Sequence, residues 1–154
     1  MTIKGDIEMT ATYYDVKQVY ARNYGSDRLY KRNYCNNLYY TTGIMDFAET
    51  LNAYWIVDNM VSYMPKIIKA YKEHEFTFFV VEIVLNQKQQ GYMEVFTENY
   101  IEGEYNEHIS IIKQNLSFID LPVKVDEEIT SYKFFLELSA IEPVTYTLLL
   151  TSEH

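Results

Sequence analysis

The sequence predicts an α+β fold, with two helices packed on one face of a mostly antiparallel sheet of about five to six strands. Two observations predict this fold class. Apolar residues in residues 42–72 follow the spacing of amphipathic helices, whereas residues 75–150 contain several short apolar or alternating runs typical of strands. Helices that precede the strands along the chain are the order expected of an α+β domain.

Two helices are expected before residue 73. In residues 42–51 the apolar side chains fall at i, i+3, i+4 and i+7, which places Ile44, Phe47, Ala48 and Leu51 on one face. Thr41 or Thr42 can cap this helix, because a threonine hydroxyl accepts a bond from a free backbone N–H. Residues 53–72 repeat the pattern. Pro65 removes one N–H and clashes with the preceding turn, so a kink or break is expected there.

Strands are expected at 75–85, 91–98, 107–116, 131–138 and 144–150, with a short one at 28–34. The first of these, EFTFFVVEIVL, is apolar on both alternating sets of positions, which is typical of a strand buried on two faces. Residues 10–22 are compatible with a short helix or a turn.

One domain spanning residues 1–154 is expected, with residues 1–26 as an N-terminal extension. Cys35 is the only cysteine, so no intramolecular disulfide forms. The N-terminus lacks the apolar region of a signal peptide, and no stretch approaches the roughly 20 apolar residues of a membrane helix. The cytoplasm is therefore the expected compartment, without membrane association.

The charge is unevenly distributed along the chain. The net charge is −9, but residues 1–37 carry +2, residues 38–72 carry 0 and residues 73–154 carry −11. An acidic region of this size repels phosphate, so direct nucleic-acid binding is not expected. It favours partners with basic surfaces. A solvated surface that only maintains solubility is the alternative interpretation.

The sequence offers no catalytic signature, and the protein is not expected to be an enzyme. Its three histidines, His74, His108 and His154, show no HxxxH or HxH spacing, and there is no CxxC pair or glycine-rich phosphate loop. Cys35 has no histidine near it in sequence. Neither a metal nor a cofactor is expected.

The segment 94–107, EVFTENYIEGEYNE, is the candidate partner-binding region. It has five glutamates, two tyrosines and no basic residue, so acids provide steering and aromatic rings provide contact area. The candidate residues are Glu94, Glu98, Tyr100, Glu102, Glu104, Tyr105 and Glu107. An exposed hairpin with an ordinary charged face is the alternative.

A second hypothesis concerns the tyrosine-rich N-terminal region. Tyr30, Tyr34 or Tyr40 would stack on the base of a nucleotide signal, and Arg28 or Arg32 would bind its phosphate. The protein would then sequester a small ligand. Pairing of edge strands into a homodimer is compatible with either hypothesis.

The stretch from residue 38 to 62 resembles the start of a small uncharacterised domain family encoded by bacteria, phages and mobile elements. LSFIDLPV at 116–123 is similar to a Tyr/Phe-x-Asp-Phe-Pro-Leu box of that family, and LLLTSEH to its Leu-Leu-Leu-Pro-Ser-Glu ending. The matching residues of the first stretch are Tyr40, Thr41, Gly43, Phe47, Ala48, Glu49, Ala53, Tyr54, Trp55 and Asp58.

This resemblance covers residues 27–154 and departs before residue 27 and around 98–107. It implies a mobile-element setting in a bacterial host cell, with Trp55 as a core residue and Pro122 as a turn residue, but it implies no activity. In character, a short, acidic, tyrosine-rich chain of this origin looks like an anti-defence protein, of which anti-CRISPR inhibitors of Cas9 are the best-populated class. The leading hypothesis is therefore an inhibitor that binds a Cas9–guide RNA complex, whose nucleic-acid channel is positively charged, and blocks DNA cleavage.

Overall fold

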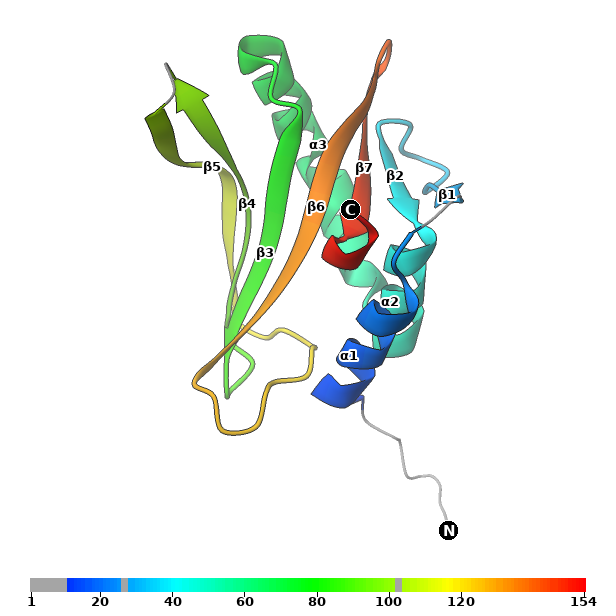
Figure 1. The fold of residues 1–154 in the computed structure, drawn as a ribbon, viewed down its shortest axis with the longest axis vertical. Coiled ribbons are helices and arrows are strands. Elements are labelled where there is room, and N and C mark those ends of the chain that lie inside the picture. Colours follow the sequence, from blue (N-terminus) through cyan, green and yellow to red (C-terminus); the bar gives the residue numbers. More distant parts are fainter. Residues whose placement is uncertain (1–10, 26–27, 102–103) are drawn as a thin grey trace.

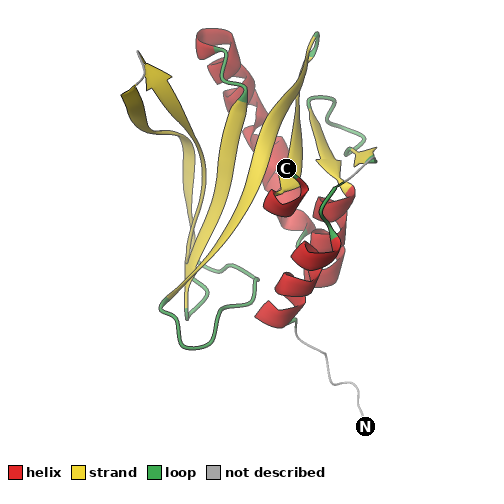
Figure 2. Ribbon diagram, in the orientation of Figure 1, coloured by secondary structure: helices red, strands yellow, loops and turns green. Residues whose placement is uncertain are grey.

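The computed structural model of the chain describes residues 11–25, 28–101 and 104–154, with side chains described outside residues 99–107. Within these ranges the chain forms three α-helices, seven strands and a short 3₁₀ turn (Figures 1 and 2). In chain order they are α1 (Tyr13–Arg22), β1 (Leu29–Tyr30), β2 (Leu38–Thr41), α2 (Thr42–Leu51), α3 (Tyr54–His74), β3 (Phe78–Asn86), β4 (Gly91–Ile101), β5 (Glu104–Leu116), β6 (Ile129–Ile141), β7 (Val144–Leu150) and η1 (Thr151–Glu153).

The seven strands form one sheet in the order β1-β2-β7-β6-β3-β4-β5. Every neighbouring pair is antiparallel except β2 and β7, which run parallel, so the sheet is mixed. Figure 1 shows α3 behind this sheet, whereas η1 and the C-terminus lie in front of it. Within the described ranges, no helix combines the length and the apolar character that a membrane-spanning helix requires.

The predicted architecture of two helices on five to six mostly antiparallel strands is wrong. A third helix, α1, forms because Asp15 accepts a hydrogen bond from the N–H of Thr12 at its start (2.8 Å), and because Val16 and Val19 are buried. The seventh strand and the mixed pairing arise from β2, which pairs with a strand from the opposite end of the chain. Local periodicity carries no information about such a pairing.

The individual elements agree better with the sequence. Helix α2 has the predicted bounds, and the Thr41 hydroxyl caps it by accepting a bond from the N–H of Ile44 (3.2 Å). Strands β3 to β7 overlap their predicted ranges. Helix α3 continues through Pro65, so the predicted break is absent. Pro65 lies on the exposed side of α3, where its ring points away from the core.

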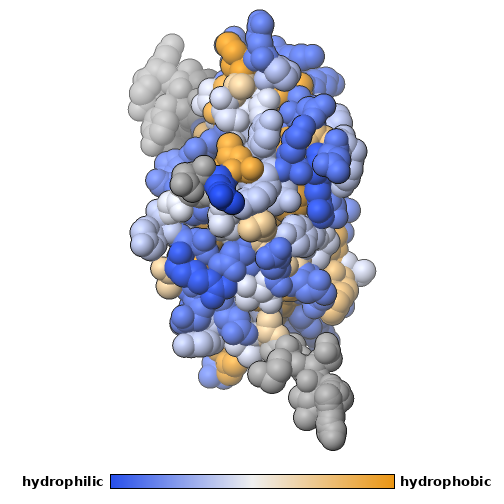
Figure 3. Space-filling model, turned by 90° about the vertical axis from the view of Figure 1, so that its right-hand side faces the viewer, coloured by the Kyte–Doolittle hydropathy of each residue, from blue (hydrophilic) through white to orange (hydrophobic). Residues whose placement is uncertain are grey.

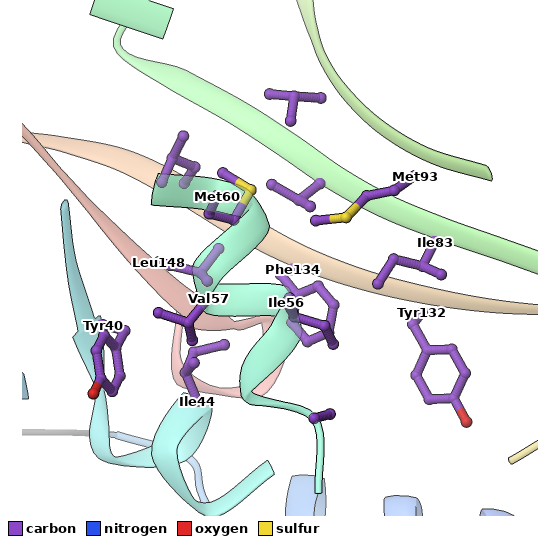
Figure 4. Packing of buried hydrophobic residues seen from close by; sticks show 14 of the residues in the cluster. Tyr40, Ile44, Ile56, Val57, Met60, Ile83, Met93, Tyr132, Phe134 and Leu148 are labelled. Atoms are coloured by element: carbon purple, nitrogen blue, oxygen red, sulfur yellow. The ribbon is translucent and has the colours of Figure 1, made fainter. Parts of the chain in front are cut away.

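The core lies between the helices and one face of the sheet, which we call the inner face (Figure 4). On β3, Phe79, Val81, Ile83 and Leu85 point to this face and are completely buried. The intervening residues of β3, beginning with Phe78, point to the opposite face and are only half-buried. The prediction that this strand is buried on both faces is therefore wrong, because the helices pack against one face only.

The side of the molecule that carries α1 and β1 is mainly hydrophilic, and its hydrophobic residues form small separate patches (Figure 3). Exposed apolar side chains such as Tyr14 and Leu29 are normal when they are isolated. This side therefore offers no broad apolar contact area in Figure 3. A candidate contact surface is better sought on the sheet itself.

Candidate functional site

The outer face of the sheet, opposite the helices, is the candidate site. The strand register aligns its residues into rows that cross the strands. One row is apolar and consists of Phe96 on β4, Val80 on β3, Phe135 on β6 and Leu149 on β7. The next row is charged and consists of Lys113 on β5, Glu94 on β4, Glu82 on β3 and Lys133 on β6.

Aromatic contacts order the apolar row. The ring of Phe78 lies 5.0 Å from that of Phe135, and the imidazole of His154 lies 5.0 Å from the same ring. Phe96 stacks on His108 at 4.1 Å. Phe96 and Leu149, at the two ends of the row, are buried. Val80 and Phe135, at its centre, remain half-buried and so keep part of their surface available for a contact. The row therefore forms a fixed apolar stripe across the sheet.

Carboxylates surround the stripe. Glu82 accepts a hydrogen bond from the hydroxyl of Ser131 (2.7 Å), and Glu137 lies 2.5 Å from Nε2 of His154. Together with Glu94 and Glu98, the outer face carries four glutamates and two lysines, Lys113 and Lys133. It is therefore acidic when its histidines are neutral.

Glu94 is held inside the protein. Its side chain is 7% exposed, and its Oε2 lies 2.9 Å from Nε2 of His108. Burial alone would raise the pKa of Glu94, but hydrogen bonds to His108 and Ser110 outweigh it, so the pKa is lowered. Glu94 is therefore an ionised hydrogen-bond acceptor that orders His108 and, through it, Phe96.

The structure places the predicted partner-binding residues in different environments. Glu94 is buried, whereas Glu98 is exposed and pairs in register with His108. The side chains of the remaining members lie outside the described part of the chain: Tyr100, Glu102, Glu104, Tyr105 and Glu107. Sequence reasoning missed Glu82, Phe135 and Glu137, which the outer face brings together. In the sequence, only the alternation of residues along β3 and β6 indicates that they lie on one face of the sheet. That pattern shows which of them are neighbours only once the strand register is known.

The N-terminal tyrosines and arginines proposed for a nucleotide already have partners in the protein. Tyr30 stacks on Tyr40 at 5.8 Å. Arg32 pairs with Asp58 (Nε to Oδ1, 3.0 Å), and the hydroxyl of Tyr34 donates to the same oxygen (3.0 Å). These contacts fasten the segment around β1 to α3. In the described part of the chain, no group of three or more His, Cys, Asp or Glu residues is placed to hold a metal ion.

Two of the three motifs that carry the family resemblance, residues 38–62 and the LLLTSEH ending, meet at one structural junction. The carboxylate of Glu153, near the C-terminus, accepts hydrogen bonds from the Thr41 hydroxyl (2.6 Å), the Gly43 N–H (3.1 Å) and the Leu150 N–H (2.9 Å). Trp55 packs against the core, as the resemblance implies. Thr41, Gly43 and Glu153 therefore have a structural role, because their hydrogen bonds hold the chain end against the start of α2.

Comparison with known proteins adds a family but no activity. No curated protein and no solved structure matches the chain. A family model does match, over residues 15–154, and it begins within α1, earlier than the resemblance that starts at residue 27. Because the match covers nearly the whole chain, the protein belongs to the family of unknown function DUF6876.

Proposed function

We propose that the protein acts by binding another protein through the outer face of its sheet. The observation that supports this is the centre of the apolar stripe, where the half-buried Val80 and Phe135 lie among glutamates on the face opposite the helices. A complementary partner presents lysine or arginine side chains around an apolar patch.

The two kinds of residue have separate roles in such a complex. Buried aromatic side chains near the centre of an interface are among the few residues that provide most of its affinity. Phe135, supported by Phe78 and His154, is the anchor in this scheme. The glutamates at the margin accelerate association with a basic surface and select against acidic ones. Glu82 and Glu137 are the best placed to interact with a basic partner, since both are half-buried on strands next to the stripe.

A guide-loaded Cas9 nuclease is the partner that we propose to test first. Its nucleic-acid channel is positively charged, and a protein of this size and acidity that occupied the channel would prevent DNA from entering. The support is the acidic outer face together with the charge of residues 73–154. In this role the protein would be an anti-defence inhibitor without catalytic activity of its own.

The experiment is a DNA-cleavage assay with a panel of guide-loaded Cas9 enzymes, with and without the purified protein. The test variant reverses two charges on the outer face, Glu82→Lys with Glu137→Lys. The matched control makes the same charge change at exposed positions elsewhere, Glu73→Lys with Glu128→Lys. Thermal melts establish that both variants fold.

We expect dose-dependent loss of cleavage by at least one enzyme. The outer-face variant should need roughly tenfold more protein for the same inhibition, most visibly at low salt, because screening weakens steering. The control should stay close to the original protein. Full cleavage by every enzyme would reject the nuclease as partner. Equal weakening of both variants would show that net charge matters and that the outer face does not.

A further inference from the structure

A pocket lies between α1 and the first residues of β6. Strand β7 ends at Leu150, opposite Phe134, so residues 129–133 of β6 extend beyond it. Helix α1 lies against this free part of β6, where the hydroxyl of Tyr20 donates to the backbone carbonyl of Lys133 (3.0 Å). The hollow that remains has a volume of about 620 Å³.

Aromatic residues form the wall of this pocket. It is lined by Tyr13, Tyr20 and Tyr132, together with Val16 and Ala21. The ring of Tyr13 lies 6.0 Å from that of Tyr132, and the hydroxyl of Tyr132 donates to the carbonyl of Pro122 (2.6 Å). Burial raises the pKa of both Tyr20 and Tyr132, so these hydroxyls stay neutral and keep donating. The rings are therefore held in place before any ligand arrives.

The polar part of the lining consists of two lysines together with Ser131 and Thr151. Lys17 comes from α1 and Lys133 from β6, and no acidic residue lines this pocket. Within the described ranges neither lysine takes part in an ion pair. Lys133 lies next to Glu82 in the strand register but forms no ion pair with it. Two lysines that line one hollow are unexpected in a chain of net charge −9, and they favour an anion.

A second hollow of about 440 Å³ adjoins the first, with Tyr13 and Lys17 lining both. It adds Lys124, whose Nζ lies 5.1 Å from the centre of the Tyr13 ring. Tyr13 thus lies between two basic compartments. Glu127 is the acidic residue that lines the second hollow.

We propose that the pocket between α1 and β6 binds a small anion that carries one aromatic ring, of the nucleoside monophosphate class. The ring would stack against Tyr13, which is half-buried, because aromatic side chains stack on any base. Tyr132 is 2% exposed, so it supports the ring of Tyr13 and is not itself a stacking surface. The phosphate would lie between Lys17 and Lys133, where charge-assisted hydrogen bonds form. A volume of about 620 Å³ falls within the ordinary range for small-ligand sites. This site is distinct from the Tyr30, Tyr34 and Tyr40 region.

Isothermal titration calorimetry with AMP and UMP tests the proposal. Adenosine, a ring without the anion, and ribose 5-phosphate, an anion without the ring, serve as the two partial ligands. The test variant is Lys17→Ala with Lys133→Ala. The matched control removes two exposed lysines from α3, Lys66→Ala with Lys69→Ala. Far-UV circular dichroism establishes that each variant is folded.

We expect at least one monophosphate to bind more tightly than both partial ligands. The Lys17→Ala, Lys133→Ala variant should bind it at least about tenfold more weakly, since each charge-assisted bond is among the stronger ones. The Lys66→Ala, Lys69→Ala control should bind as the original protein does. The proposal is overturned if neither monophosphate binds at about 1 mM, which corresponds to roughly −4 kcal/mol. It is also overturned if ribose 5-phosphate binds as tightly as AMP, or if the lysine variant retains full affinity.

Discussion

Replacing Gly43 with alanine is expected to destabilise the protein, although alanine is the better helix former. A Cβ at this position would lie 2.4 Å from both Cδ and Oε1 of Glu153, closer than any real contact. The carboxylate must therefore leave the place where it accepts bonds from Thr41, Gly43 and Leu150. The substitution thus acts through the chain end that Glu153 fastens to α2.

The magnitude follows from the bonds that are lost. Three charge-assisted hydrogen bonds at a partly buried helix start contribute about 2–3 kcal/mol together. Replacing glycine with alanine in a helix raises the free energy of unfolding by about 1 kcal/mol, because alanine has the higher helix propensity. The free energy of unfolding should therefore fall by about 1–2 kcal/mol in Gly43→Ala. In a Glu153→Ala background, where no carboxylate is left to displace, the same substitution should raise it by up to about 1 kcal/mol.

Urea unfolding of the original protein, both single variants and the double variant measures this coupling, which should be about 2–3 kcal/mol. Far-UV circular dichroism follows the transition, and unchanged m-values would show that only stability has changed. If Gly43→Ala costs the same free energy in both backgrounds, Glu153 is not the reason for glycine at this position, and the reasoning is refuted.

Two further predictions concern the packing of α1 and α2. Hydrogen bonds from Arg22 (Nε to Oδ2, 2.6 Å), and then from Asn23 and Thr50, hold the pKa of Asp46 below its usual value despite burial. The ionised Asp46 therefore adds to the free energy of unfolding at any pH above its unfolded-state pKa of about 3.9. This stabilisation is lost as the pH falls through the lower folded-state pKa. Asp46→Asn should be about 1–2 kcal/mol less stable at pH 7. This difference should begin to shrink as the pH falls below about 4 and should vanish only below the folded-state pKa of Asp46. Urea unfolding from pH 7 to 3 checks this, and a constant difference over that range would contradict it. Phe47→Ala should lower the free energy of unfolding by about 3–5 kcal/mol, because Phe47 is 1% exposed and its ring lies 5.2 Å from that of Phe134. Thermal unfolding measures the loss. A loss under about 1 kcal/mol would contradict this packing.

Much of the local structure could be predicted from the sequence, because periodicity depends on neighbours along the chain. The i, i+3, i+4, i+7 spacing predicted α2 with its correct bounds, and Thr41, one of the two predicted cap candidates, is the cap. Alternating and apolar runs predicted β3 to β7. Helix α1 gave a weak signal, since only Val16 and Val19 of its ten residues are buried.

The candidate site was less predictable. Counting acids along the chain pointed to residues 94–107, but that count treated Glu94 as a surface residue. The fold buries it against His108, a residue fourteen positions away on the neighbouring strand. The same register brings Glu82 and Glu137 beside the apolar stripe. Sequence distance says nothing about which residues face each other across strands.

By itself, the sequence determined helices α2 and α3, the approximate extents of β3 to β7, the −11 charge of residues 73–154 and the lack of any catalytic motif. The tertiary structure alone decided the parallel pairing of β2 with β7, the junction of Glu153 with Gly43 and the pocket between α1 and β6. The physical reason is the range of the forces involved. Periodicity and capping act within one element, whereas strand pairing, a carboxylate at a distant helix start and the shape of a hollow depend on how the whole chain packs.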